Sequence, residues 1–294
     1  MNMGRVYRFL DKIRRRKKLW WSFAFLALLS YLGYIVYLFI DREFLVADEL
    51  PFYDVGPRPE DDTLRIAMIG DSWAEYHKRD DCDTLFEQYG KRLTSKPIKC
   101  MSRGKGGAKS KEVYYNMFRS QTQEYSICSQ PLLEEHPDYC VIMVGINDTW
   151  KKRPISYFTG NYRLIIRLLL ANKIRPVVME IPDFEMGEWL NTHRKRKRQL
   201  YRLYSYFTGV VEDDITPFRD GLRKMLKDTG LGDSVLFIPA DHWIPQNHQY
   251  SEEIYQPDHV HINYQGYHIL DSCIASEIMN DYQKRKELSP LIEN

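Results

Sequence analysis

Apolar and polar positions alternate with a regular period along most of the chain from Leu64 onward. Short apolar runs bounded by turn-forming residues predict buried strands at Leu64–Ile69, Pro97–Met101, Tyr139–Val144, Arg175–Ile181 and Ser234–Ile238. Apolar residues at helical spacing predict helices at Asp83–Leu93, Lys111–Phe118, Tyr162–Asn172, Trp189–Phe207, Pro217–Leu226 and about Tyr264–Lys284. Strands that alternate with helices favour an α/β fold in which helices cover both faces of a parallel sheet.

The amino-terminal region differs, because its apolar residues form one unbroken run. No charged residue occurs between Trp20 and Ile40, and a helix of that length spans about 30 Å, the thickness of a bilayer core. Trp21 and Tyr37 lie near its ends, where aromatic rings favour the membrane interface. A cleaved signal peptide would have a shorter apolar region and a small-residue cleavage site, which the sequence D-R-E-F-L-V-A-D-E does not offer. A buried core helix is rarely apolar on every face for so long, so we expect an uncleaved transmembrane anchor.

The residues around this run predict its orientation. The segment before it is basic, with Asp11 as its only acidic residue, and contains Arg5, Arg8, Lys12, Arg14, Arg15, Arg16, Lys17 and Lys18. Positive flanking segments stay in the cytoplasm, which predicts a single-pass protein whose remaining chain is extracytoplasmic. The stretch from Asp41 to Asp62 is acidic, contains prolines and has no clear period, as a linker does. The predicted organisation is a cytoplasmic segment at 1–19, an anchor at 20–40, a linker at 41–62 and a folded domain at 63–294.

The overall charge of the chain excludes few classes of function. The 294 residues carry a formal net charge of +2, which neither favours nor excludes an anionic partner. The basic stretch His193–Arg202 is explained most simply as a solvated helix face, with a surface for anionic lipid headgroups or an anionic polymer as the alternative. No nucleic-acid-reading module is recognisable, so we expect no nucleic-acid partner.

The five cysteines have no zinc-ligand spacing, since neither a C-x-x-C motif nor a suitable Cys/His pair occurs. Cys100, Cys140 and Cys273 lie in apolar stretches and are expected to be buried thiols. Cys82 and Cys128 lie in polar surroundings and could pair in an oxidising compartment; the sequence leaves both states open.

The first predicted strand ends in the tripeptide Gly70-Asp71-Ser72. A serine just past such a strand lies at the carboxyl edge of the sheet, where α/β proteins place their chemistry. Gly70 would let the backbone turn sharply there. Ser72 is therefore a candidate nucleophile, although the tripeptide by itself is better explained as a turn in which Asp71 and Ser72 bond local backbone.

A nucleophilic serine needs a base, an acid that orients the base, and donors for the oxyanion. His261 is the candidate base. Asp258 lies three residues earlier, a spacing that lets its carboxylate reach Nδ1 and stabilise the imidazolium. The neighbouring histidines His242, His248 and His259 are expected to be loop or cleft residues rather than bases.

Two loops that follow predicted strands supply candidate oxyanion donors. The loop S-R-G-K-G-G-A-K-S follows Met101 and can expose a backbone N–H, for which Gly107 is the first candidate and Gly104 the second. A flexible surface turn is the alternative, and the loop lacks the spacing of a phosphate-binding P-loop. The loop G-I-N-D-T-W follows Val144, and its Asn147 either aims its side-chain NH₂ at the same oxyanion or forms an Asx turn.

These segments together resemble the motif blocks of the SGNH/GDSL hydrolase superfamily. The matching blocks, in chain order, are Gly70-Asp71-Ser72-Trp73, the glycine loop with Gly107, Gly145-Ile146-Asn147-Asp148 as G-x-N-D, and Asp258-His259-Val260-His261 as D-x-x-H. The resemblance extends over about Leu64–Lys284 and excludes the anchor. Ser102 stands where the second block usually begins with Asn, and Trp73 replaces an aliphatic residue; neither departure removes a catalytic group.

The resemblance implies a three-layer α/β/α sandwich with a small parallel sheet, as in flavodoxin-like proteins. It implies Ser72 as the nucleophile, His261 as the base and Asp258 as the residue that orients it. It also implies an oxyanion hole formed by the Ser72 N–H, the Gly107 N–H and the Asn147 side chain, with no metal or other cofactor.

Combined with the anchor, the resemblance predicts a membrane-anchored serine esterase that acts on O-acetyl groups of an extracytoplasmic polysaccharide. Four aromatic residues could form a platform for a sugar or equally well pack in the core, namely Trp150, Trp243, Tyr250 and Tyr255. The alternatives are an O-acyltransferase that uses the same triad to acylate glycan hydroxyls, a non-catalytic anchored scaffold for glycan assembly, and an esterase that acts on membrane lipid.

Overall fold

The structure is a computed structural model that describes residues 3–120, 128–185, 195–210, 215–244 and 253–292, with side chains described from 16 to 287 within these ranges. It consists of two compact units, Met1–Leu45 and Val46–Asn294. Several residues singled out above lie outside the described part, namely His193, His248 and Tyr250, as do the side chains of the basic block before Arg16.

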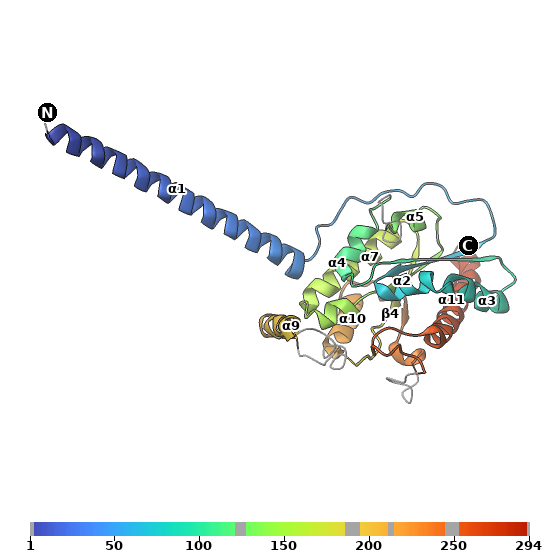
Figure 1. The fold of residues 1–294 in the computed structure, drawn as a ribbon. Helices are drawn as coiled ribbons and strands as arrows, with labels where there is room; N and C mark the ends of the chain where they lie inside the picture. The colour runs from blue at the N-terminus through green and yellow to red at the C-terminus, as the bar shows by residue number, and fades with distance from the viewer. Residues whose placement is uncertain (1–2, 121–127, 186–194, 211–214, 245–252, 293–294) are drawn as a thin grey trace. The chain divides into compact units, whose positions relative to one another are not determined.

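The first unit is a single long helix, α1 (Met3–Phe44), drawn in blue in Figure 1. Its segment Arg16–Phe44 comprises 29 residues, and the large apolar side chains from Leu19 to Ile40 are exposed. Trp20 and Trp21, for example, are 74% and 76% exposed. By its length and composition this helix can cross a membrane.

The second unit is built on a five-stranded sheet in the order β2-β1-β3-β4-β5, in which every pair of neighbours is parallel. The strands are β1 (Leu64–Gly70), β2 (Ile98–Gly104), β3 (Tyr139–Met143), β4 (Arg175–Met179) and β5 (Leu236–Ile238). All the predicted strands are present, with ends that differ by a few residues. β1 and β3 are buried along their whole lengths, as expected of parallel strands covered on both faces.

Helices form one layer on each face of the sheet (Figure 1). One layer contains α2 (Ser72–Arg79), α3 (Cys82–Leu93) and α11 (Tyr264–Ile292). The other contains α4 (Ser110–Asn116), α7 (Ile155–Ala171) and α10 (Thr216–Asp228). The predicted α/β fold with three layers is therefore confirmed. The shorter and peripheral helices are α5 (Gln130–Leu133), α6 (Ile146–Trp150), α9 (Lys195–Thr208) and the 3₁₀ helices η2 (Gly232–Ser234) and η3 (Ala240–His242).

Two helices near the sheet were not predicted. α2 begins directly after β1, and α6 begins directly after β3. Both are short, at 8 and 5 residues, so neither contains enough turns to give a recognisable apolar period. The predicted helix Trp189–Phe207 corresponds to α9, whose described residues begin at Lys195.

Gly70 is needed for a different reason from the one expected. It ends β1 next to β3, and a side chain at Gly70 would begin 2.0 Å from the carbonyl oxygen of Met143. Its φ angle does not lie in the left-handed region that favours glycine. The chain does turn from strand to helix between Gly70 and Ser72, but the glycine is required by the close approach of a neighbouring strand rather than by the turn.

The first part of the second unit, residues 46–63 before β1, packs against the rest of that unit through hydrogen bonds. The backbone N–H of Ala47 donates to Asn161 Oδ1 at 2.8 Å, and that of Leu50 donates to the Tyr114 hydroxyl at 2.8 Å. The Tyr53 hydroxyl donates to a main-chain carbonyl of the second helix layer at 2.6 Å. This segment is therefore fixed to the domain at several points.

All five cysteines are thiols. Cys100 and Cys140 are buried, as expected, and Cys273 is half-buried. Cys82 and Cys128 are also fully buried. The surroundings of Cys82 are nevertheless polar, since its Sγ lies 3.8 Å from the Asp80 carbonyl oxygen and Asp271 is nearby. Burial raises the pKa of the Cys82 thiol to about 12, which keeps it protonated.

Candidate active site

The carboxyl ends of three neighbouring strands bring the predicted site residues to one edge of the sheet. Ser72 follows β1, Gly107 follows β2 and Asn147 follows β3. Because β1 lies between β2 and β3 and all three are parallel, their carboxyl ends meet at this edge.

Ser72 is the first residue of α2 and is 7% exposed. Asp71 precedes it as the N-cap, and its Oδ1 accepts a hydrogen bond from the Trp73 N–H at 3.1 Å. A side-chain acceptor at the N-cap satisfies a backbone N–H of the first helical turn, which has no partner within the helix. The N–H of a first helical residue has no partner within its own helix. The Ser72 N–H therefore remains available to a ligand at the carboxyl edge of the sheet.

His261 lies against Ser72 although 189 positions separate them in the chain. Its Nε2 is 2.8 Å from Ser72 Oγ, and its Nδ1 is 2.5 Å from Asp258 Oδ2. In this geometry a serine proton can move to the imidazole while the carboxylate stabilises the resulting positive charge. The structure thus brings together the three residues predicted to form the triad.

The Asp258 carboxylate is held by its own loop. Its Oδ1 accepts hydrogen bonds from the backbone N–H groups of Val260 at 3.0 Å and His261 at 2.9 Å. Burial alone would raise the pKa of Asp258, but the hydrogen bonds from His261 and the backbone outweigh it and hold the pKa below its ordinary value. Asp258 is therefore ionised at neutral pH.

Trp73 connects the helix of the serine to the loop of the histidine. Its indole Nε1 donates to the Val260 carbonyl at 3.2 Å, and its own carbonyl accepts from the Tyr267 hydroxyl at 2.7 Å. Tyr76, one turn after Ser72 on α2, packs against the His261 ring at 4.7 Å between centroids. Trp73, which replaces the aliphatic residue of the family motif, thus supports the position of His261.

Gly107 has the backbone conformation that the glycine loop needs. Its φ angle is +75°, in the left-handed region that other residues rarely adopt. No intramolecular acceptor is found for its N–H among the described residues. Gly104, the second candidate, instead ends β2, where a side chain would begin 2.3 Å from the Asp71 carbonyl oxygen. The structure therefore favours Gly107 over Gly104 as an oxyanion donor.

The amide of Asn147 is oriented by two partners. Its Oδ1 accepts a hydrogen bond from the Trp150 indole at 2.8 Å, and its Nδ2 donates to Asp71 Oδ2 at 3.1 Å. The NH₂ group therefore points toward the turn that carries Ser72, and its second hydrogen remains for a ligand. Burial raises the pKa of Asp71 to about 7, against the opposing effect of hydrogen bonds from Trp73 and Asn147.

Sequence reasoning missed Lys151. It caps the carboxyl end of α6, and its Nζ donates to the Gly107 carbonyl oxygen. Lys151 lies four positions after Asn147, which places both on one helical face. This spacing could have identified the residue if α6 had been predicted as a helix.

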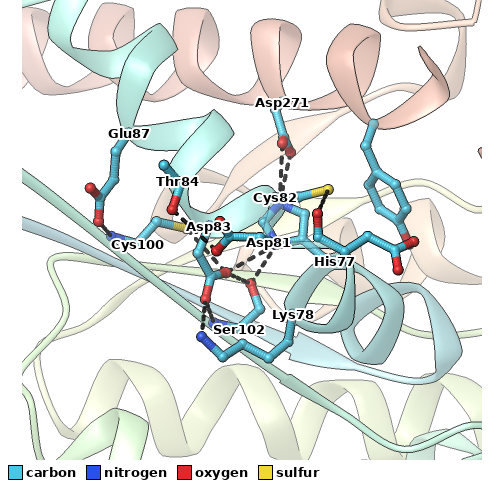
Figure 2. Close-up of polar contacts among 12 residues, drawn as sticks. His77, Lys78, Asp81, Cys82, Asp83, Thr84, Glu87, Cys100, Ser102 and Asp271 are labelled. Atoms are coloured by element: carbon cyan, nitrogen blue, oxygen red, sulfur yellow. Dashed lines mark hydrogen bonds and ion pairs between the residues drawn. The ribbon is translucent and has the colours of Figure 1, made fainter. Parts of the chain in front are cut away.

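A buried polar cluster surrounds His77 of α2 (Figure 2). His77 Nδ1 lies 3.1 Å from Asp83 Oδ1 and 2.7 Å from Ser102 Oγ, whereas its Nε2 lies 3.0 Å from Asp271 Oδ1. Burial alone would lower the pKa of His77, but Asp271 and Asp83 raise it to about 9. His77 is therefore an imidazolium held between two carboxylates.

Ser102 is the residue that departs from the family pattern at the second block. Its hydroxyl donates to Asp83 Oδ1 at 2.5 Å, so it belongs to the cluster around His77. Cluster members come from α2, α3, β2 and α11, as Figure 2 shows for the residues it labels. The cluster therefore joins the helix that begins at Ser72, the strand that leads to the glycine loop and the helix that follows His261.

The remaining histidines and aromatic residues lie elsewhere. His242 pairs with Glu277 at 3.1 Å, and His259 pairs with Glu185 at 2.8 Å. Trp150, Trp243 and Tyr255 are each at most 5% exposed, so these three side chains are packed in the interior and do not form an exposed platform for a sugar.

Comparison with known proteins agrees with this arrangement. The sequence profile of the GDSL-like Lipase/Acylhydrolase family matches residues 68–269. No curated protein sequence was found to match the chain. Among solved structures, the lipase/acylhydrolase from Enterococcus faecalis is 18% identical with a TM-score of 0.50, over 74% of this chain and 96% of that chain. A GDSL-like lipase from Bacteroides thetaiotaomicron VPI-5482 is 15% identical with a TM-score of 0.49, over 74% of this chain and 88% of that one.

The similarity to solved structures and the match to the family profile support different conclusions, the first about the fold and the second about the family. At such low identity, the likeness to the Enterococcus faecalis protein shows a shared fold. The profile match extends over most of the chain and includes the segments of Ser72, Gly107, Asn147 and His261. The chain therefore belongs to the GDSL-like lipase/acylhydrolase family of the SGNH/GDSL superfamily, whose members are serine hydrolases that act on esters.

Proposed function

We propose that this protein is a membrane-anchored esterase that removes O-acetyl groups from an extracytoplasmic polysaccharide, with Ser72, His261 and Asp258 as its catalytic triad. The observation that carries the proposal is the 2.8 Å contact between Ser72 Oγ and His261 Nε2, with Asp258 on the other ring nitrogen. This is the relationship that activates a serine hydroxyl at neutral pH.

In the first step, Ser72 Oγ attacks the ester carbonyl carbon while its proton moves to His261 Nε2. The negative charge that develops on the carbonyl oxygen accepts hydrogen bonds from the Ser72 N–H, the Gly107 N–H and the Asn147 side chain. The bond between the carbonyl carbon and the alcohol oxygen then breaks. His261 gives its proton to that oxygen, and the alcohol leaves an acyl-serine behind.

In the second step, water attacks the acyl-serine and gives a proton to His261. The bond to Ser72 Oγ breaks, the proton returns to that oxygen, and acetic acid is released as acetate. If a glycan hydroxyl takes the place of water, the same site transfers the acyl group instead. The two functions therefore differ only in the acceptor.

The proposed membrane location rests on α1 and on the residues before it. The helix segment Arg16–Phe44 contains an exposed, uncharged run from Trp20 to Ile40 that has the length of a membrane span. The basic residues that precede it favour a cytoplasmic amino terminus, which would place the folded unit outside the cytoplasm. An anchored esterase outside the cytoplasm has access to the acylated polysaccharides of the cell surface.

The triad is tested with the full-length chain in a non-ionic detergent. Acetate release from 4-nitrophenyl acetate and from O-acetylated polysaccharide is measured for the wild type, Ser72→Ala and His261→Ala. We expect both variants to lose at least about 10³-fold in kcat. Ser95→Ala, an exposed serine in the segment between α3 and β2, is the matched control and retains wild-type rates. Equal rates in all four proteins would contradict the proposed triad.

Two further experiments test the identity of the acyl acceptor and the presence of the membrane anchor. Acetylated glycan accumulating in place of free acetate would favour the acyltransferase. Intact mass of the protein extracted from membranes distinguishes the anchor, which retains residues 1–40, from a cleaved signal sequence, which does not. Protection of the folded unit from protease in intact cells would contradict an extracytoplasmic location.

A further inference from the structure

An ammonium group lies at the edge of the proposed oxyanion hole. Lys151 follows Asn147 by one turn, and its Nζ donates to the Gly107 carbonyl oxygen. The same Nζ lies 3.6 Å from the point at which a side chain on Gly107 would begin. Its charge is therefore adjacent to the loop that carries Gly107, the proposed oxyanion donor.

A second ammonium group lies near the same aromatic ring as the first. The Nζ atoms of Lys151 and of Lys197, from α9, each lie 5.1 Å from the centroid of the Trp150 ring. Tyr201, also from α9, packs edge-on against this ring at 5.0 Å between centroids. Since the Trp150 indole also donates to Asn147, one side chain holds both cations and an oxyanion donor.

These two cations have no carboxylate within ion-pair distance in the part of the chain that the structure describes. Burial lowers the pKa of Lys151 to about 8; Glu112 and Asp148 oppose this shift, and the charges of Lys109 and Arg153 add to it. Burial also lowers the pKa of Lys197. Lys197 is itself an exposed residue, so the cost of desolvation falls mainly on Lys151. A partly desolvated cation without a counter-ion costs free energy, which a bound anion would recover.

We propose that Lys151 and Lys197 bind an anionic group of the substrate, so that the ester attacked by Ser72 belongs to an acidic acylated carbohydrate with a carboxylate close to the acyl group. This inference rests on the proposed function, because the anion and the ester are parts of one molecule. The half-buried Lys151 ammonium attracts a carboxylate more strongly than it would in bulk water, and the exposed Lys197 ammonium adds a weaker, more screened attraction. The acidic carbohydrate would thereby be oriented with its ester at the oxyanion hole.

The test compares two acetyl esters that differ in one charge. 4-Acetoxybenzoate carries a carboxylate, and its methyl ester, methyl 4-acetoxybenzoate, is neutral. The quantity measured is the ratio of kcat/KM for the anionic ester to that for the neutral ester, with the full-length chain at about pH 7. We expect Lys151→Met and Lys197→Met each to lower this ratio about three- to tenfold relative to the wild type, mainly through KM of the anionic ester. Intrinsic differences in ester reactivity cancel in this comparison.

Lys195→Met is the matched control, because Lys195 is an exposed lysine of the same helix two positions away and on a different face. It is expected to keep the wild-type ratio. About 1 M NaCl, which shortens the screening length to about 3 Å, is expected to lower the wild-type ratio toward that of the variants. We expect the wild type to release acetate faster from O-acetylated pectin than from acetylated xylan. We expect no such preference in the two lysine variants.

An unchanged ratio in both lysine variants would overturn the inference while leaving the proposed function intact, since both esters would still be hydrolysed in a Ser72-dependent manner. Absence of hydrolysis of either ester would instead remove the proposed function. Release of fatty acid from phosphatidylglycerol vesicles in preference to acetate from acidic polysaccharide would overturn the assignment to a carbohydrate.

Discussion

His77 Nε2 lies 3.0 Å from Asp271 Oδ1, and this contact joins the helix that begins at Ser72 to the helix that follows His261. Both side chains are fully buried. On its other side the same imidazolium meets Asp83, next to β2 and therefore next to the strand that leads to Gly107. The contact therefore ties together the two helices that flank the proposed nucleophile and base in the chain.

This contact predicts how stability changes with pH. The pKa of His77 rises from 6.5 in the unfolded chain to about 9 in the folded protein, so the folded state binds more protons between these values. The stabilisation is fully present below pH 6.5 and is lost as pH rises through about 9. We expect the free energy of unfolding of the wild type to fall by on the order of 2 kcal/mol over this window through His77.

The measurement is urea denaturation at both ends of the window, followed by tryptophan fluorescence. The double variant His77→Gln/Asp271→Asn replaces the ion pair with two neutral amides of similar size. Other titrating groups, Lys151 among them, contribute to both proteins, so the difference between the two pH dependences isolates the pair. Parallel pH dependences in the two proteins would show that His77 is neutral in the folded state.

Trp73→Phe tests the link between α2 and the histidine loop. The substitution removes the hydrogen bond to the Val260 carbonyl and leaves that buried oxygen without its donor. We expect a loss of about 1–3 kcal/mol in stability and about a tenfold fall in kcat with little change in KM. The control is Trp243→Phe, because the Trp243 indole is equally buried and its N–H has no hydrogen-bond partner among the described residues. Equal kcat values in the two variants would mean that the Val260 contact does not position His261.

Gly70→Ala tests the close approach of β1 and β3. A methyl group there would begin 2.0 Å from the Met143 carbonyl oxygen, and neither strand can move away without breaking the sheet. We expect a loss of at least about 3 kcal/mol in stability or no soluble protein at all. At Gly232, by contrast, the nearest atom would be 4.0 Å away, and Gly232→Ala is expected to change stability by less than about 0.5 kcal/mol. Comparable thermal stability of the two variants would contradict this explanation.

Asn147→Ala tests the oxyanion hole. Loss of one such donor typically lowers kcat by about 10²–10³-fold while substrate binding is little affected, because the donor acts on charge that develops in the transition state. Steady-state kinetics with 4-nitrophenyl acetate separate the two parameters. Asn172→Ala, at the carboxyl end of α7, serves as the control. A rise in KM with kcat unchanged would assign Asn147 to ground-state binding instead.

Several features were predictable because they depend on local sequence. The strand-forming runs of the sheet are strongly apolar and alternate with helices, which is enough to predict a parallel three-layer fold. Ser72, Gly107 and Asn147 each follow such a run, so their meeting at one edge follows from the parallel order of the strands. The Asp258 and His261 pair has the short spacing that a single turn can close.

Other features depend on contacts between distant parts of the chain. His77 and Asp271 are 194 positions apart, and nothing in their neighbouring residues indicates that they form a buried pair. The role of Gly70 depends on a carbonyl of another strand. Cys82 and Cys128 stand among polar residues in the sequence but are covered by other elements in the fold. The position of Lys151 beside the glycine loop was not predicted, because α6 is too short to show a helical period.

The central claim is that Ser72 is a nucleophile activated by His261. The most direct measurement is mass spectrometry of the full-length protein after reaction with a fluorophosphonate, which traps an activated serine by forming a covalent phosphonyl ester. The account predicts a single adduct on the peptide that contains Ser72, absent in Ser72→Ala and formed at least about 10³-fold more slowly in His261→Ala. An adduct on a different residue, or esterase activity that persists undiminished in Ser72→Ala, would contradict it.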